Sequence, residues 1–272
     1  MSEAFTQATF GYDGRVVAIS GGAGTIAIEL AAAFMRAGAM VAIWSRKQTS
    51  LDAALSRLAQ IDQARVVGVL ADSGSEAEVA AAIAETSARL QTPDVLINAV
   101  GGNRGKGPFN EIDVAAFEDI LRLNLIAGLV VPTKQVAKHW IAAGRSGCIV
   151  NIASMSSFRP LSGVWAYDAA KAGVVNLTAA TAKEYAAQNI RVNAIAPGFI
   201  VAEQNRRLLI KDDATGELTE RGASVIAHTP MRRFAEAREM CGAALFLASE
   251  QAASFVTGVT LPIDGGFLVD TV

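Results

Sequence analysis

The sequence has few residues of the kinds that build metal centres, disulfides or polyanion-binding surfaces. Its 272 residues include two cysteines and two histidines, and neither pair has metal-ligand spacing. We interpret Cys148 and Cys241 as buried small apolar residues rather than a disulfide or a nucleophile. The net charge of −2 offers no electrostatic basis for binding nucleic acid. We therefore expect no metal site and no nucleic-acid partner.

Long apolar runs are also missing. No stretch of about 18 apolar residues is free of charged or turn residues, so neither a membrane-spanning helix nor a membrane partner is predicted. The polar start of the chain lacks the basic-then-apolar order of a signal peptide, which favours a cytoplasmic location. Mean hydropathy is nonetheless +0.32. Buried parallel strands and an oligomer interface explain the excess of apolar residues.

Short apolar β-branched runs alternate with alanine-rich stretches of helical period. Strands are predicted near 15–20, 40–44, 65–70, 94–99, 147–153, 190–196 and 258–263. Helices are predicted near 25–37, 48–60, 75–90, 113–143, 163–187 and 235–249. Strands that are apolar throughout and separated by single helices indicate an α/β fold: a doubly wound parallel sheet in three αβα layers. Ligands bind such a sheet at the carboxyl ends of its strands.

A glycine-rich turn follows the first predicted strand and leads directly into a helix. Small residues let the backbone approach a pyrophosphate, and the helix N-terminus offers free N–H groups and a partial positive charge. The strand before the turn and the helix after it make a dinucleotide site the favoured interpretation. Its expected contacts are Gly21, Gly22, Ala23, Gly24, Thr25 and Ile26.

The end of the second predicted strand lacks a carboxylate that could bind an adenosine 2′-hydroxyl. Ser45, Arg46 and Lys47 instead offer hydrogen-bond donors and two positive charges, which suit a 2′-phosphate. We therefore favour NADP(H) over NAD(H), although both cations could also be solvated loop residues. After the fourth strand, Asn98 and the glycines that follow could hold neighbouring backbone beside a ribose, or could form an Asx turn.

Tyr167 and Lys171 are one turn apart on the predicted helix 163–187, so they share a face. An ammonium beside a phenol favours the phenolate, so we expect the pKa of Tyr167 to fall below its usual value of about 10. Such a tyrosine can exchange a proton with an alcohol near neutral pH. Ser154, at the end of a predicted strand, can reach the same oxygen. Tyr-x-x-x-Lys alone is more often an ordinary surface pair, but with Ser154 it favours alcohol–carbonyl interconversion.

Taken together, these motifs resemble the short-chain dehydrogenase/reductase family over nearly the whole chain. The matching positions, in order, are the glycine-rich turn, Asp72, Asn98, Gly101, Asn124, Ser154, Tyr167, Lys171, Pro197-Gly198 and Asp264-Gly265-Gly266. The resemblance implies a Rossmann-type fold, a nicotinamide cofactor and a homotetramer or homodimer. It implies catalytic roles for Ser154, Tyr167 and Lys171, with Asn124 holding a water next to Lys171. It also implies cofactor contacts at Asp72, Ser73, Ala99, Gly101, Pro197, Gly198 and Ile200, and from Tyr167 and Lys171.

The glycine-rich turn departs from the family pattern. Thr25 stands where the family has its second glycine, and a β-branched residue resists positive φ. We expect Gly24 to take that role. Ala202 replaces a threonine that commonly follows Pro-Gly, which would loosen the hold on the nicotinamide amide.

We expect a flexible segment at 1–13 and one catalytic domain over 14–272. The stretch 199–234 interrupts the alternation of strands and helices and is interpreted as a lid-like insertion, or else as a solvated excursion. Cations, amides and a hydroxyl on loops expected to face the site suit a polyhydroxylated, anionic small molecule. They are Asn103, Arg104, Ser156, Arg159, Gln204, Asn205 and Arg206, the last of which could equally lie on a surface helix.

Within the family the chain is similar to the D-mannonate oxidoreductases (fructuronate reductases). This similarity lies in the turn Ser20–Ala27, in Gly101-Gly102-Asn103 and in the segment 197–206. The expected function is hydride transfer between NADP(H) and a secondary alcohol or ketone, such as a sugar acid or polyol. One alternative is a 3-oxoacyl-type ketoreductase. Another is a non-catalytic NADP(H) sensor, although such sensors normally lack part of the Ser–Tyr–Lys set.

Overall fold

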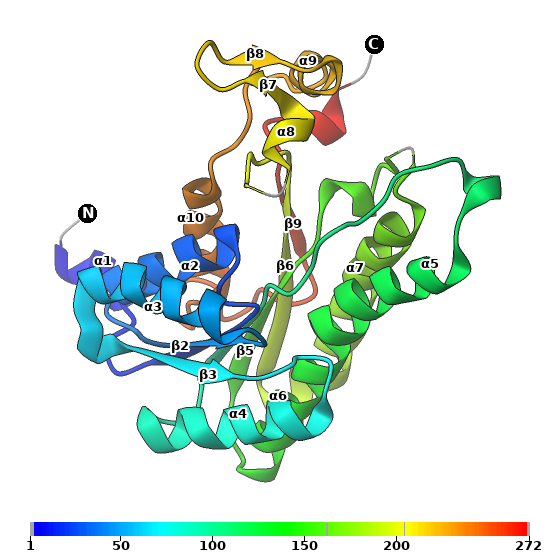
Figure 1. Ribbon diagram of the computed structural model, residues 1–272. Helices are drawn as coiled ribbons and strands as arrows, with labels where there is room; N and C mark the ends of the chain where they lie inside the picture. Colours follow the sequence, from blue (N-terminus) through cyan, green and yellow to red (C-terminus); the bar gives the residue numbers. More distant parts are fainter. Residues whose placement is uncertain (1–2, 162, 204, 271–272) are drawn as a thin grey trace.

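Seven parallel strands form one sheet in the order β3-β2-β1-β4-β5-β6-β9 (Figure 1). The chain is known from a computed structural model that describes residues 3–161, 163–203 and 205–270. Chain order reverses between β1 and β4, and in sheets of this kind ligands bind at the carboxyl ends of the strands at such a reversal. The strands of the sheet are β1 (Val16–Ser20), β2 (Met40–Ser45), β3 (Val66–Leu70), β4 (Val95–Asn98), β5 (Gly147–Ile152), β6 (Ile190–Pro197) and β9 (Thr260–Ile263).

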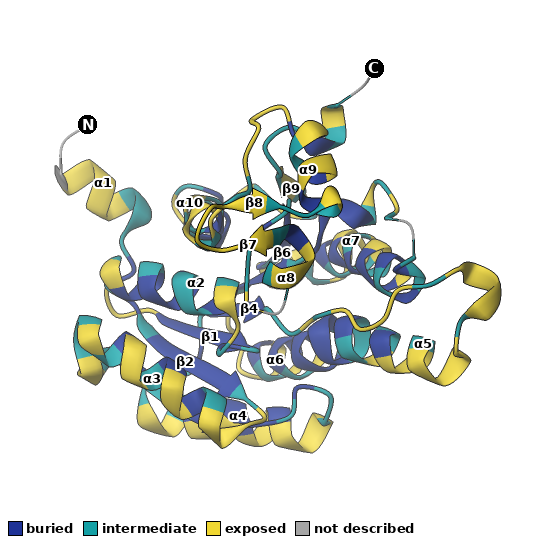
Figure 2. Ribbon diagram, turned by 45° about the horizontal axis from the view of Figure 1, so that its top comes forward, coloured by how far each residue is buried: buried dark blue, intermediate teal, exposed yellow. Residues whose placement is uncertain are grey.

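Helices cover both faces of the sheet. One layer contains α2 (Thr25–Arg36), α3 (Gln48–Asp62) and α10 (Cys241–Ala248); the other contains α4 (Glu76–Arg89), α5 (Val114–Leu121), α6 (Val131–Ala142) and α7 (Trp165–Tyr185). Central strands such as β1 are buried at every position because both of their faces are covered (Figure 2). The predicted doubly wound, Rossmann-type fold is confirmed, and each strand of the sheet starts and ends within two residues of its predicted range.

One predicted helix is divided into three segments, and the N-terminal segment has secondary structure that the sequence pattern did not predict. The predicted helix 113–143 consists of α5, a π-helical segment η3 (Arg122–Val130) and α6. The N-terminal segment, expected to be flexible, contains helix α1 (Glu3–Phe10), and the buried Tyr12 donates a hydrogen bond to Leu245 O. The Tyr12 ring also packs edge-on against Phe34, so Tyr12 is attached to the domain, and the flexibility of the segment 1–13 remains a prediction.

The insertion after β6 has secondary structure of its own. It contains α8 (Arg206–Leu209), the antiparallel pair β7 (Ile210–Asp212) and β8 (Glu217–Leu218), and α9 (Glu220–Ala227). These elements stand above the carboxyl ends of β6 and β9 in Figure 1. The insertion therefore occupies the end of the molecule at which the predicted site lies, and its action as a lid remains a prediction.

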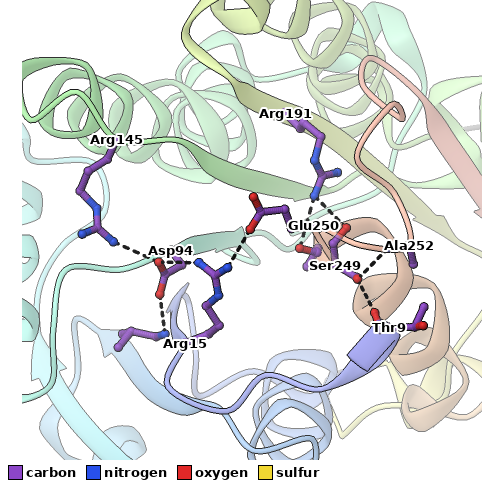
Figure 3. Close-up of polar contacts among 10 residues, drawn as sticks. Thr9, Arg15, Asp94, Arg145, Arg191, Ser249, Glu250 and Ala252 are labelled. Carbon is purple, nitrogen blue, oxygen red and sulfur yellow. Dashed lines mark hydrogen bonds and ion pairs between the residues drawn. The ribbon is translucent and has the colours of Figure 1, made fainter. Parts of the chain in front are cut away.

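Ion pairs gather at the opposite edge, where the strands begin (Figure 3). The Asp94 carboxylate accepts from Val16 N at 2.9 Å, from Arg145 at 3.0 Å and from Arg15 at 3.3 Å. Arg15 also pairs with Glu250 at 2.7 Å. These contacts tie the starts of β1 and β4 to the loops around them. Among the described residues no helix is long and apolar enough to cross a membrane, and no group of metal-ligating side chains occurs.

Candidate active site

The three predicted catalytic side chains come together at the carboxyl edge of the sheet. Ser154 follows β5 directly, and Tyr167 and Lys171 lie on the first two turns of α7. The Ser154 hydroxyl is hydrogen-bonded to the Tyr167 phenol. The Lys171 ammonium lies 5.8 Å from the centre of the Tyr167 ring. Ser154 and Lys171 are buried, at 5% and 4% exposure, so each is removed from bulk water.

The electrostatics of Tyr167 differ from the sequence-based expectation. Burial raises the pKa of Tyr167, and the hydrogen bond with Ser154 opposes this rise without reversing it. The expected lowering by Lys171 is therefore wrong for this structure. The ammonium donates to Ile152 O at 2.7 Å instead, and burial lowers the pKa of Lys171 to about 8. Tyr167 thus carries its proton at neutral pH.

Asn124 lies in the π-helical segment, fully buried. Its side-chain oxygen accepts from Gly102 N at 3.0 Å, and its amide donates to Gly102 O at 2.7 Å and to Ile120 O at 3.0 Å. A Cβ atom at Gly101 would lie 2.9 Å from the Asn124 oxygen and 3.4 Å from Lys171 Nζ. The glycines after β4 thus let Asn124 and Lys171 approach the same stretch of backbone, and the water-holding role of Asn124 remains a prediction.

The first glycine of the glycine-rich turn leaves no room for a side chain. Gly21 has φ +69°, and a Cβ atom there would lie 2.8 Å from Val100 N, so a larger residue would push β1 away from β4. Gly24, by contrast, has φ −77° and caps the N-terminus of α2. The expectation that Gly24 takes the positive φ is therefore wrong, because the chain turns where β1 ends. No side chain caps the start of α2, so its N–H groups face outward, available to an anion.

The predicted adenosine corner lies at the ends of β2 and β3. Arg46 and Lys47 are exposed, and within the described part of the chain neither cationic group has an ion-pair partner. Asp72 accepts from Gly74 N at 2.8 Å, and Ser73 beside it is buried. The cations are thus free to meet a phosphate.

Asn98 is part of a buried polar chain across the sheet. Its oxygen accepts from Ser20 Oγ at 3.2 Å, and its amide donates to Asn151 Oδ1 at 2.8 Å and to Thr133 Oγ1 at 2.9 Å. Asn151 in turn donates to Thr178 on α7 at 2.9 Å. Asn98 thus braces the glycine-rich turn and β5 rather than forming an Asx turn. Sequence reasoning missed its partners because their polar side chains lie in otherwise ordinary strand and helix patterns.

Beyond β6 the backbone crosses β9 closely. Gly198 N donates to Ile263 O at 2.9 Å, and a Cβ atom at Gly198 would lie 2.7 Å from the Asp264 Cα. Pro197 ends β6, Ala99 follows β4, and Ile200 forms a β-bridge with Ala235. These backbone segments lie at the same end of the sheet as the glycine-rich turn. The glycines at 21, 101 and 198 let neighbouring parts of the chain approach one another at this end of the sheet. The uncapped N-terminus of α2 beside the glycine-rich turn fits the pyrophosphate of a dinucleotide.

The predicted substrate residues do not gather in one place as the predicted catalytic residues do. Arg159 donates to Phe267 O at 3.3 Å and to Asp270 O at 2.9 Å. Asn205 closes a turn onto Ala202 and Ile200, and Arg206 pairs with Asp213 at 2.7 Å. Asn103 and Arg104 are exposed, Ser156 is buried beside Ser154, and Gln204 lies outside the described residues.

Comparisons with known proteins match the whole of this architecture. The family model described as Enoyl-(Acyl carrier protein) reductase matches residues 21–268. The chain is 34% identical to the uncharacterized oxidoreductase UxuB of Bacillus subtilis (strain 168), over 94% of this chain and 95% of that one.

Two solved structures are similar throughout. One, from Haemophilus influenza with bound NAD, is provisionally named a D-mannonate oxidoreductase; it has a TM-score of 0.87 and 30% identity, covering 97% of this chain and 99% of that one. The other is a gluconate 5-dehydrogenase from Burkholderia cenocepacia J2315 in complex with NADP and tartrate. It has a TM-score of 0.86 and 32% identity, covering 98% of this chain and all of the other.

Proposed function

Since this chain belongs to the short-chain dehydrogenase/reductase family and is an NAD(P)-dependent oxidoreductase, we propose that it interconverts the secondary hydroxyl and the ketone of a sugar acid or polyol, such as mannonate and fructuronate, with NADP(H). The observation that carries the proposal is the Ser154–Tyr167–Lys171 group beside the glycine-rich turn. When bound, the nicotinamide supplies or accepts the hydride.

The chain's own residues move and hold the proton. The Tyr167 phenol keeps its proton at neutral pH, which is the form that donates to a developing alkoxide during carbonyl reduction. Ser154 Oγ accepts from Ser156 N at 3.1 Å, and its own hydroxyl, which meets the Tyr167 phenol, can donate to the same alkoxide when a substrate is bound. For alcohol oxidation Tyr167 must first lose its proton, so this direction gains rate as the pH rises.

The cofactor preference rests on Arg46 and Lys47. Two exposed cations without ion-pair partners among the described residues, at the end of β2, suit a 2′-phosphate. The similar solved structures contain NAD in one case and NADP in the other. The proposal of NADP(H) therefore depends on this chain's own charges.

The substrate class rests on similarity and on polar loops. A gluconate 5-dehydrogenase and a provisional D-mannonate oxidoreductase resemble the chain from end to end. Asn103 and Arg104 are exposed on the loop after β4, where they could meet a carboxylate. Arg159 and Arg206 hold protein groups instead, so the loop after β4 is the stronger candidate for substrate contact.

A panel of aldonates, uronates, polyols and acyl thioesters, each with NADP(H) and NAD(H), tests the proposal. We expect turnover of at least one sugar acid or polyol, with a higher kcat/KM for NADP(H). Turnover of acyl thioesters alone would favour the 3-oxoacyl-type reductase. NADP(H) binding without turnover of any compound would indicate the sensor alternative.

We further propose a homotetramer or homodimer. The edge strand β9 and the loop before it carry exposed apolar side chains, with Phe255 at 101%, Val259 at 42% and Leu261 at 39% exposure. Light scattering coupled to gel filtration would measure the assembly, and Leu261→Glu should weaken it; a monomeric wild type would end this proposal.

A further inference from the structure

Two buried polar atoms close to Ser154 and Tyr167 lack hydrogen-bond partners. They are Ser156 Oγ and Asp168 Oδ1, the only such side-chain atoms within the described residues. Ser156 is 3% exposed and Asp168 is 8% exposed. A buried polar atom without a hydrogen-bond partner destabilises the fold, so two of them next to Tyr167 require an explanation.

These two atoms belong to side chains that face each other. The Ser156 hydroxyl lies close enough to the Asp168 carboxylate to oppose the rise in its pKa that burial causes. An ionised carboxylate only accepts hydrogen bonds, whereas a hydroxyl can donate one. Rotation of the Ser156 side chain would therefore satisfy both atoms at once, with Ser156 as the donor and Asp168 as the acceptor.

The pair also joins the two segments that carry the chemistry. On the loop after β5, Ser156 N donates to Ser154 Oγ at 3.1 Å, and Leu161 N donates to the second Asp168 oxygen at 3.0 Å. One turn further along α7, Ser157 Oγ donates to Lys171 O at 2.8 Å. Contacts thus run from Tyr167 to Ser154, on to Ser156 and Asp168, and back through the α7 backbone to Tyr167.

We propose that Ser156 and Asp168 are positioning residues, which act together to hold the Ser154 hydroxyl against the Tyr167 phenol. This role rests on the proposed function, in which Ser154 and Tyr167 contact the reacting oxygen. Ser156 acts through its backbone N–H on Ser154 and through its hydroxyl on Asp168. Asp168 anchors the loop at Ser156 and at Leu161 N.

Asp168 has a second, electrostatic effect. Its negative charge, one residue from Tyr167, disfavours the phenolate and adds to the rise in the pKa of Tyr167. Among the described loop residues, the Ser156 hydroxyl and the Leu161 N–H contact Asp168, and neither titrates. On α7 the ionisable neighbours are Tyr167 and Lys171, and Lys171 donates to Ile152 O. The Asp168 charge should therefore be visible in the titration of Tyr167.

Four variants separate position from charge. Ser156→Ala removes the linking hydroxyl, Asp168→Ala removes both anchors, and Ser156→Ala/Asp168→Ala removes both partners. Asp168→Asn keeps the size and an acceptor for Leu161 N but loses the charge. Ser87→Ala and Asp62→Asn are matched controls, because Ser87 donates to Ile83 O and Asp62 accepts from Ala64 N, both far from the site.

In kinetics, we expect Ser156→Ala and Asp168→Ala to lower kcat by about tenfold, with little change in KM for the cofactor. The double variant should lose no more than the worse single variant, because the two residues act as a unit. Asp168→Asn should keep kcat within about threefold. In the pH–rate profile of alcohol oxidation it should shift the acidic limb to lower pH by on the order of one unit, because removing the negative charge lowers the pKa of Tyr167. Losses that add in the double variant, or wild-type kinetics throughout, would overturn the proposal.

A substrate-free measurement keeps this test separate from the proposed function. The chain has three tyrosines, so tyrosinate absorbance in wild type minus Tyr167→Phe isolates Tyr167. Asp168→Asn should lower the pKa of Tyr167 in this titration even if no substrate in the panel is turned over. An unchanged Tyr167 titration would refute the electrostatic effect of Asp168. A lower Tm without any loss of kcat in Asp168→Ala would reduce Asp168 to a stabilising residue and refute its positioning role.

Discussion

The two ends of the parallel strands, where the strands begin and where they finish, use buried and charged groups in opposite ways. Where the strands begin, Asp94 is shared by two arginines and a backbone N–H, and Arg191 donates to Ser249 O (Figure 3). Arg191 also donates to Leu247 O. Where the strands end, a buried ammonium has a carbonyl oxygen as its partner, and a buried carboxylate has an unpartnered oxygen.

This contrast separates stabilising groups from reactive ones. Where the strands begin, each of these charges is matched by opposite charges or by carbonyl oxygens, so these groups stabilise the fold. At the other end burial is incompletely compensated, so the pKa of Lys171 falls to about 8 and that of Tyr167 rises. Proton transfer needs groups whose pKa is shifted in this way. Variants where the strands finish should therefore change turnover, and variants where the strands begin should change stability.

Tyr167→Phe should have the largest effect. It removes the one proton that the site can pass to the reacting oxygen, so kcat should fall by about 10²–10⁴-fold while NADP(H) binding is retained. Stopped-flow turnover and fluorescence titration of NADPH measure the two quantities. Near-native turnover would remove Tyr167 from the mechanism, and lost NADPH binding would show a structural defect instead.

Lys171→Met tests the incompletely compensated burial directly. In the wild type Lys171 has an ordinary pKa of 10.5 when unfolded and about 8 when folded. Between these values the unfolded state binds more protons, so stability should rise with pH through this window, by at most about 3 kcal/mol. The stabilising contribution is complete above the unfolded value and is lost as the pH falls through the folded value.

Urea unfolding of both proteins at several pH values from 7 to 11 gives the comparison. The Met variant should lack this part of the rise, because its side chain does not titrate. Parallel pH dependence in the two proteins would mean that burial does not lower the pKa of Lys171.

The sequence allowed the frame of this site to be predicted, but not its electrostatics. Alternating apolar runs predicted where each strand begins and ends. These strand ends in turn predicted that Ser154 and Tyr167 lie close together at one end of the sheet. Spacing alone, however, places Lys171 beside Tyr167. It does not reveal that the Lys171 ammonium donates its hydrogen bond to Ile152 O instead. Nor does spacing reveal how deeply each group is buried, which determines the direction of the pKa shift.

The same limit applies to local backbone and to partners. The π-helical segment around Asn124 has the composition of an ordinary apolar helix, so the pattern predicted a single helix. Arg159 and Arg206 have the side chains of an anion site, yet tertiary contacts use them to hold Asp270 O and Asp213. Residue type predicts what a group can bind, whereas the fold determines what it meets.

Arg46→Asp should have a smaller but selective effect. A carboxylate at the end of β2 would repel a 2′-phosphate and accept from a 2′-hydroxyl, so the ratio of kcat/KM for NADP(H) over NAD(H) should fall by roughly tenfold or more. Lys138→Asp, an exposed site on α6 with the same change in charge, is the control. An unchanged ratio would remove Arg46 from the cofactor site.

Asp94→Asn should have the smallest effect and should leave turnover unchanged. The amide can still accept from Val16 N, but it loses the charge shared by Arg15 and Arg145. Both arginine side chains are nearly half exposed, at 49% and 44%, so solvent screens the pairs, and we expect a loss of about 1 kcal/mol in the free energy of unfolding. Because salt screens exposed charges, this loss should shrink in about 1 M NaCl, whereas the effects of Tyr167→Phe on kcat should persist. If Asp94→Asn instead lowered kcat at unchanged stability, the two ends would be coupled, and the division between a stabilising end and a reactive end would fail.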